Sequence, residues 1–342
     1  MRIPRFLTAL LFIAGAAGCG GGGTQPPPQN TRPALGLLLD RLEHERWHRD
    51  RDLFVKRVEE LRGTVLVRTG DGDPEKQAAE ATALLDAGVK VLVVVPTDLD
   101  KAAAIVKAAA ARQVPVISYD RLIRNAEVAL YVSFDSVKVG RMQAAHLLEL
   151  APKGNYLLLG GAENDHNATL VRNGQLEILK PAIASRAIRI VGDPWIPGWD
   201  AAEARTATAA ALKKTRQIAA VVASNDAIAG GAVEALGGVG LAGKVPVSGQ
   251  DADLAACQRI IAGTQAMTVY KPLIPLARMA AFEAMRLVDG EAIDKSTTVN
   301  NGTGEVAARL LDPISVNKGN IDATVIRDGY QKREDVYGGG TN

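Results

Sequence analysis

Short apolar runs alternate with longer amphipathic stretches along the chain from residue 33 onward. An apolar run bounded by polar residues predicts a buried strand, whereas apolar residues spaced three and four apart predict a helix with one face on the core. Residues 91–95 read Val-Leu-Val-Val-Val, which is typical of a strand buried on both faces of a parallel sheet. The pattern therefore predicts an α/β protein.

The alternation also predicts where the elements lie. Strands are expected at residues 34–39, 64–68, 91–95, 114–118, 128–133, 156–159, 188–191, 219–223 and 245–248, and helices at 45–62, 74–87, 101–112, 137–150, 169–181, 201–214 and 227–236. Asp73 is a suitable N-cap for the second of these helices, and Pro74 suits its first turn. Repeated strand–helix units imply parallel sheets with right-handed crossovers, and two successive series of them imply two similar lobes.

Polar and aromatic side chains gather where the predicted strands end, which is where open parallel sheets bind ligands. They are Asp40, Glu45, Arg46, Trp47, Asp120, Arg121, Asp165, Asn167, Arg172, Trp195, Trp199, Asn225, Asp226, Gln250, Asp251 and Lys271. Carboxylates accept hydrogen bonds from hydroxyl groups, an arginine donates in a fork, and a tryptophan face can stack on C–H groups. Together these side chains favour a neutral polyhydroxyl ligand, a sugar. The alternative is a set of helix caps and surface ion pairs.

Several short motifs around these positions are shared with a known family. The motifs are Glu45-Arg46-Trp47, Ser118-Tyr119-Asp120-Arg121, Ser133-Phe134-Asp135, Val191-Gly192-Asp193-Pro194-Trp195, Ala223-Ser224-Asn225-Asp226, Ser248-Gly249-Gln250-Asp251-Ala252-Asp253 and Met267-Thr268-Val269-Tyr270-Lys271-Pro272. They resemble the bacterial D-xylose-binding proteins, which are periplasmic components of ABC transporters in the type I sugar-binding-protein class. The resemblance extends over about residues 34–337, and the motifs around Asp251 and Lys271 are its most specific part.

The resemblance implies a site. Carried over position by position, the ligand contacts fall on Arg46, Asp120, Arg121, Asn167, Arg172, Asn225, Asp251 and Lys271, with Trp47 and Trp199 on the two faces of the sugar ring. Asp165 is a further candidate. Arg41 stands where the family often has a second acid, and His44 and His166 also depart from the family pattern. These departures bear on fine specificity more than on sugar binding.

The resemblance also implies a type I periplasmic-binding-protein fold, with two Rossmann-like lobes joined by three hinge strands and the sugar between them. We expect residues 31–135 plus 270–305 in the N-terminal lobe and 136–269 plus 306–342 in the C-terminal lobe. The implied partners are a monosaccharide, D-xylose first, and an ABC permease with its ATPase subunit that reads the closed form. A monomer without metal or other cofactor is expected, and no enzymatic activity.

The amino-acid composition excludes several functional classes of protein. Lys and Arg total 40 against 38 Asp and Glu, so the formal charge is only +2, which argues against a nucleic-acid surface or a polybasic membrane face. Hydrophobic residues make up 47% of the chain, enough for a sizeable core. The two cysteines, Cys19 and Cys257, cannot form a disulfide scaffold or a cysteine-rich zinc site.

The first thirty residues are predicted to be an export signal and a tether. Arg2 and Arg5 precede an apolar stretch at 6–18 that is too short to span a bilayer as a helix. The run Ala16-Ala17-Gly18-Cys19 resembles a bacterial lipobox, with Ala16 where leucine is usual. We therefore expect Cys19 to carry a lipid that holds the protein in the periplasm or on the outer face of the cell envelope. The alternative is an ordinary signal peptide that is cleaved nearby. Residues 20–30 are rich in Gly and Pro and suit a spacer.

Rival functions have weaker support. Residues 44–48 match the H-E-x-x-H zinc-hydrolase pattern, but no third ligand is marked out. Residues 315–318 match S-x-x-K without the accessory motifs. A sugar-responsive repressor would carry an N-terminal helix-turn-helix in place of the signal sequence. A sensory input protein for chemotaxis or a sensor kinase, or a binder of another pentose or hexose, would use the same site and stays open as an alternative.

Overall fold

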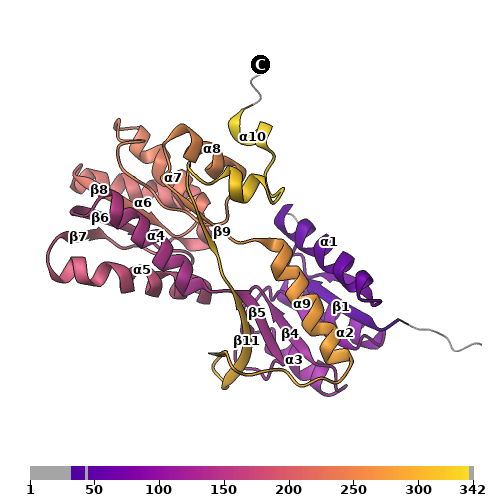
Figure 1. Ribbon diagram of the computed structural model, residues 1–342. Coiled ribbons are helices and arrows are strands. Elements are labelled where there is room, and N and C mark those ends of the chain that lie inside the picture. Colours follow the sequence, from indigo (N-terminus) through magenta and orange to yellow (C-terminus); the bar gives the residue numbers. More distant parts are fainter. Residues whose placement is uncertain (1–31, 43–44, 339–342) are drawn as a thin grey trace, which may run out of the picture. The chain divides into compact units, whose positions relative to one another are not determined.

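A seven-stranded sheet forms the larger of two parallel sheets in the computed structural model, which describes residues 32–42 and 45–338. Its strand order is β10-β11-β5-β4-β3-β1-β2. The strands are β1 (Ala34–Leu39), β2 (Thr64–Thr69), β3 (Val91–Val94), β4 (Val116–Tyr119), β5 (Leu130–Phe134), β10 (Thr298–Asn300) and β11 (Glu305–Leu311). All neighbours pair in parallel except β10 and β11. Figure 1 shows β5 between β4 and β11 in this sheet.

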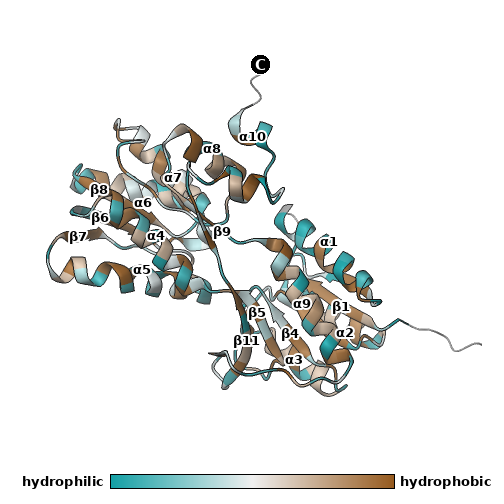
Figure 2. Cartoon of the chain, in the orientation of Figure 1, coloured by the Kyte–Doolittle hydropathy of each residue, from teal (hydrophilic) through white to brown (hydrophobic). Residues whose placement is uncertain are grey.

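Helices cover both faces of this sheet. They are α1 (Glu45–Glu60), α2 (Pro74–Asp86), α3 (Ala103–Ala110) and α9 (Leu273–Val288). Successive side chains of a strand point to opposite faces, so Leu37 packs with residues of α1 and α9 while Leu38 packs with residues of α2 and α3. Figure 2 shows β1 in brown and the charged residues of α1 in teal, as expected for a buried strand beneath an amphipathic helix.

The second sheet has three strands in the described residues, in the order β7-β6-β8. They are β6 (Gly154–Leu159), β7 (Ile188–Gly192) and β8 (Ile218–Ala223), and the helices around them are α4 (Ser136–Leu150), α5 (His166–Ala184), α6 (Ala201–Lys214) and α7 (Asp226–Gly237). The helix pair α4 and α5 packs on one face and the pair α6 and α7 on the other. The two sheets confirm the predicted α/β fold class.

The remaining elements connect to these sheets. They are a 3₁₀ turn at Pro197–Trp199, α8 (Leu254–Ala262), the antiparallel pair β9 (Thr268–Tyr270) and β12 (Ile314–Val316), a π-helical turn at Asp322–Ile326, and α10 (Arg333–Tyr337). β11 pairs with β5 of the larger sheet, so this strand, which begins at the predicted lobe boundary of 305/306, continues the first sheet.

The predicted elements match the structure closely, with two informative differences. The strand expected at 245–248 is only an isolated bridge between Val221 and Val247, because Pro246 has no N–H with which to extend the ladder. Helix α5 runs through Pro181 and is three residues longer at each end than the predicted span of 169–181. The predicted cap is confirmed, since the Asp73 carboxylate accepts hydrogen bonds from the amides of Glu75 and Lys76 at 2.8 and 3.3 Å.

Candidate functional site

Three strand ends of the larger sheet meet at Arg121. Asp40 follows β1 and is 3% exposed, and Pro96 follows β3. Arg121 Nη1 donates to Asp40 Oδ2 at 2.9 Å and to the Pro96 carbonyl at 3.2 Å. The other carboxylate oxygen of Asp40 is buried and has no hydrogen-bond partner among the described residues. The guanidinium of Arg121, which follows β4, thereby links the carboxyl ends of β1, β3 and β4 through hydrogen bonds.

Arg46, near the start of α1, forms a second polar group beside the first. It pairs with Asp120 after β4 and, at 3.3 Å, with Asp50 one helical turn away. Burial disfavours the charge on Arg46, but Asp120, Asp50 and Asp251 outweigh it and raise its pKa. Burial raises the pKa of Asp50 to about 6, although Arg46 and a 2.6 Å hydrogen bond from the Tyr119 hydroxyl oppose the shift. Arg46 is therefore held as a permanent cation between carboxylates.

The backbone of Asp120 is in the left-handed region, with φ of +64°. Its N–H donates to the carbonyl of Val132 at 2.8 Å, and its own carbonyl accepts from the Tyr131 hydroxyl at 3.1 Å and the Ser133 hydroxyl at 2.8 Å. Asp tolerates this conformation better than most residues. Strained backbone supported by surrounding hydrogen bonds is typical of functional sites. The main chain of Asp120 is thus held by residues of β5.

Asp251 and Lys271 form the counterpart next to β9. Lys271 Nζ lies 2.8 Å from Asp251 Oδ1. Asp251 contributes to the raised pKa of Arg46. Burial disfavours the charge on Asp120, but Arg46 and Lys271 outweigh it and lower the pKa of that carboxyl. The structure therefore brings Arg46, Asp120, Asp251 and Lys271 into one electrostatic group.

Arg172 on α5 stands out in the second lobe. It is 5% exposed, pairs with Asp193 after β7, and its guanidinium carbon lies 5.5 Å from the centre of the Trp195 ring. None of its three side-chain nitrogens has a hydrogen bond of acceptable geometry within the described residues. Burial lowers its pKa, and Asp193 opposes that shift. A buried guanidinium with spare donors is suited to a ligand rich in acceptors.

The two candidate asparagines have structural roles as well. Asn225 is the N-cap of α7, where its side-chain oxygen accepts from the amide of Ile228 at 2.9 Å. The side-chain oxygen of Asn167 accepts from the Ser136 hydroxyl at 3.3 Å. Asp165 caps α5 by accepting from the amide of Asn167 at 2.9 Å. Helix capping, the alternative weighed for these side chains, is thus present, and it leaves the amide nitrogens of both asparagines for other partners.

The tryptophans differ in exposure. Trp47 is 4% exposed within the core of the larger sheet, and the guanidinium carbons of Arg46 and Arg121 lie 4.6 and 5.8 Å from its ring centre. Trp199 is half-buried, and its ring covers Gly161, where any side chain would collide with it. Their role on the two faces of a sugar ring stays a prediction.

Asp226 is a buried acid that the sequence analysis placed among the polar residues at the strand ends but did not assign to a ligand contact. It is 1% exposed in the first turn of α7. Burial raises its pKa well above the usual range, and Asp253 and Asp251 add to the shift. The sequence does contain a signal for this burial. Asp226 is followed by the apolar stretch Ala-Ile-Ala-Gly-Gly-Ala-Val, which indicates that the acid lies in apolar surroundings.

The structure adds no support to the hypothesis of a zinc-hydrolase site at residues 44–48. His44 and the side chain of Glu45 lie outside the described residues, as does Cys19. Among the side chains that the structure describes, no cluster of three or more His, Cys, Asp or Glu residues could hold a metal. The buried thiol of Cys257 has a pKa raised to about 12 by burial, which is typical of an inert core cysteine.

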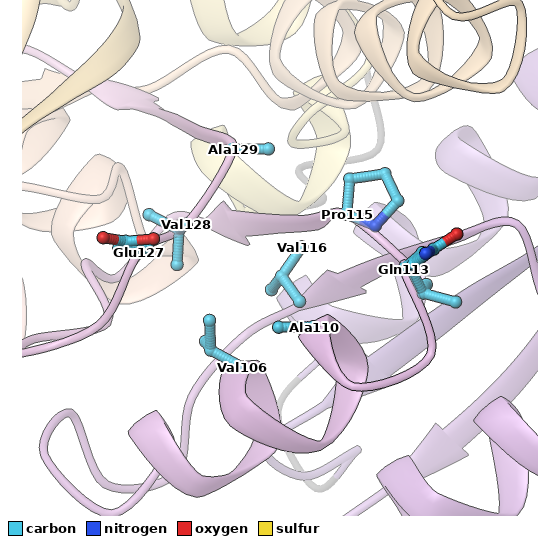
Figure 3. Close-up of a pocket in the computed structure, with 9 residues that line it drawn as sticks. Val106, Ala110, Gln113, Pro115, Val116, Glu127, Val128 and Ala129 are labelled. Carbon is cyan, nitrogen blue, oxygen red and sulfur yellow. The ribbon is translucent and has the colours of Figure 1, made fainter.

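Two shallow cavities lie away from the site. One of about 310 Å³ is next to α3 and β4, where Val106, Val116 and Val128 line it (Figure 3), and the other, of about 260 Å³, is next to Leu150 and Pro246. None of the ten predicted sugar contacts lines either cavity. Within the described ranges, the helices are too short or too polar to span a bilayer.

Comparison with known proteins supports the resemblance found in the sequence. Residues 35–292 match the family model described as a periplasmic binding protein domain. The D-xylose-binding periplasmic protein of Escherichia coli (strain K12) is 46% identical over 88% of this chain and 92% of its own length. The D-xylose-binding periplasmic protein of Haemophilus influenzae is 45% identical over 89% of this chain and 92% of its own length.

A solved structure agrees in fold. The carbohydrate transporter solute-binding protein from Chloroflexus aurantiacus, in complex with D-glucose, superposes with a TM-score of 0.79 at 31% identity, covering 89% of this chain and 98% of that one. These matches confirm the predicted family. The chain belongs to the periplasmic binding protein family and is a solute receptor without enzymatic activity.

Proposed function

We propose that this chain is the periplasmic sugar-binding component of an ABC importer and that its ligand is D-xylose. The observation that carries the proposal is the Arg172 guanidinium, which is buried with unused donors at a position that the sugar-binding resemblance assigns to the ligand. The two relatives at 45 and 46% identity are both named for D-xylose, and the Chloroflexus structure holds D-glucose. Both ligands are neutral aldoses.

The charged groups suit a ligand of this kind. Asp120 is paired with Arg46, and Asp251 with Lys271, so a hydroxyl group entering between them can donate to a carboxylate and accept from its cationic partner. Because the charges are balanced, a neutral sugar can bind without leaving an uncompensated buried charge. Asn167, Asn225 and Arg121 would supply further polar contacts, and Trp47 and Trp199 the apolar faces.

We propose that the sugar binds between two lobes. The first is built on residues 31–135 plus 270–305 and is extended by β11, which pairs with β5, and the second is built on residues 136–269 and the chain that follows β11. Hinge bending would close the lobes on the ligand, and a membrane permease with its ATPase subunit would recognise the closed form. We further propose that residues 1–18 direct export and that Cys19 carries a lipid anchor, since the residues before it resemble a lipobox.

Tryptophan fluorescence is expected to report the ligand. A soluble form lacking residues 1–30 should change its emission measurably when it is titrated with D-xylose, because a sugar face on an indole excludes water from it. Trp47 is only 4% exposed, so most of the change should come from the half-buried Trp199. Trp199→Phe should therefore lose most of the signal, and Trp47→Phe a smaller part of it.

Trp195→Phe is the matched control, because Trp195 packs against Arg172 and is not assigned to the ring. A wild-type response that is undiminished in both Trp47→Phe and Trp199→Phe would show that neither indole faces the sugar. No response in the wild type, together with binding detected by calorimetry, would contradict the stacking arrangement as well.

A further inference from the structure

The carboxylate of Asp226 joins three segments of the second lobe. Its Oδ1 accepts from Gln265 Nε2 at 2.8 Å, and its Oδ2 accepts from the Thr268 hydroxyl at 2.9 Å and from the amide of Asp253 at 3.0 Å. Gln265 precedes β9, Thr268 begins β9, and Asp253 ends the loop before α8. Hydrogen bonds from all three converge on one side chain that is 1% exposed.

The loop that Asp226 holds has a strained backbone. Asp251 has φ of +101° and Ala252 has φ of +56°, so two consecutive non-glycine residues occupy sparsely populated conformations. Such residues cost free energy and persist only where the surroundings enforce them. The Asp251 amide donates to the Val269 carbonyl at 2.9 Å, and the Ala252 amide donates to the Thr268 hydroxyl at 3.2 Å.

The hydroxyl of Thr268, at the start of β9, is hydrogen-bonded both to the 249–253 loop and to Asp226. Because its hydroxyl oxygen accepts from the Ala252 amide, its proton is directed to Asp226 Oδ2. Gly249 completes the arrangement, since a Cβ there would overlap Asp226 Oδ1 and lie 2.5 Å from Gln265 Nε2. The 249–253 loop thus packs against the carboxylate at Gly249 and is hydrogen-bonded to it through the Asp253 amide.

We propose that Asp226 is a positioning residue for sugar binding, which orients Asp251 and Lys271 by fixing the 249–253 loop against β9. The inference rests on the proposed function. Lys271 lies three positions after Thr268 and pairs with Asp251, so both members of this ion pair are on segments that Asp226 holds. Asn225, the adjacent residue and a third proposed contact, begins the helix that carries Asp226.

Variants can separate positioning from simple stability. Asp226→Asn keeps the volume but replaces one acceptor by a donor, so it cannot satisfy Gln265 Nε2 together with the other two donors. Thr268→Val removes the Thr268 hydroxyl, whereas Thr268→Ser keeps it. Thr208→Ala is a stability control in the same lobe, because it deletes a buried hydroxyl that donates to the Ala204 carbonyl at 2.8 Å within α6.

Calorimetric titration with D-xylose and amide hydrogen exchange of residues 249–253 are measured for the wild type and all four variants. Asp226→Asn and Thr268→Val are expected to weaken binding by about tenfold or more and to speed exchange in this loop. Thr268→Ser and Thr208→Ala are expected to stay within about twofold of the wild-type affinity, with wild-type exchange.

Wild-type affinity and exchange in folded Asp226→Asn and Thr268→Val would overturn the proposal. If the wild type itself binds no sugar, the proposed function fails, and the exchange measurement alone decides the positioning role. Faster exchange of residues 249–253 confined to Asp226→Asn and Thr268→Val then supports the role of Asp226 in fixing this loop, and unchanged exchange refutes it.

Discussion

Replacing Arg172 with methionine is expected to weaken D-xylose binding by roughly 2–4 kcal/mol while leaving the protein as stable as the wild type or more so. The guanidinium is buried with one ion pair and no hydrogen bond of good geometry in the described part of the chain. The side chain of its partner Asp193 is 45% exposed, so water can solvate that carboxylate when the guanidinium is removed, and an apolar side chain of similar length at position 172 costs little or stabilises the fold. The bound sugar would lose a charged donor at the same time.

Arg141→Met is the matched control for this prediction. Arg141 lies on α4, and it forms an exposed ion pair with Glu177 of α5 through hydrogen bonds of 2.9 and 2.8 Å. Exposed pairs contribute little, so both stability and affinity should be close to those of the wild type. Wild-type affinity in Arg172→Met would place the sugar elsewhere. A large loss of stability in that variant would show instead that Arg172 holds the fold.

Gly140→Ala is expected to lower the free energy of unfolding by about 3 kcal/mol or more. A Cβ at Gly140 on α4 would overlap the Val171 carbonyl of α5 and lie 2.8 Å from the Gln175 amide. Gly174 on α5 makes the reciprocal approach to the Val137 carbonyl of α4. Because backbone meets backbone at both glycines, the two helices can accept a methyl group only by moving apart.

Chemical denaturation measures this effect, with Gly237→Ala as the control. Gly237 ends α7, and a Cβ there would have no neighbour closer than 3.9 Å. Alanine at that position should be neutral or stabilise by up to about 1 kcal/mol. Equal stability of the Gly140→Ala and Gly237→Ala variants would mean that α4 and α5 pack less closely than the structure has them. Because α5 carries Asn167 and Arg172, we also expect Gly140→Ala to weaken sugar binding.

The fold was most predictable where local pattern decides it. The apolar run at 91–95 and the cap at Asp73 identified a buried strand and a helix start from neighbouring residues alone. The pairing of β11 with β5 joins segments far apart in the sequence and leaves no local signal. The strand expected at 245–248 failed for a local reason, since the apolar pattern was right but Pro246 cannot donate to a ladder.

The candidate site was predictable to a similar extent. The rule that ligands bind at the carboxyl ends of parallel strands brought Asp120 and Arg121 together with Asp40 and Arg46. The rule identifies positions but not burial, so it could not show that Trp47 is already covered by two arginines. The rule also missed the hydrogen bonds by which Asp226 fixes the 249–253 loop. That role depends on Gln265 and Thr268, which lie about forty residues away in the sequence.

Isothermal titration calorimetry of the form lacking residues 1–30, against D-xylose and a panel of other pentoses and hexoses, is the decisive test of whether this protein is a D-xylose receptor. We expect saturable binding of D-xylose at one site per chain, tighter than that of D-ribose, L-arabinose or D-glucose. The absence of binding to every sugar in the panel, by a protein shown to be folded, would contradict it.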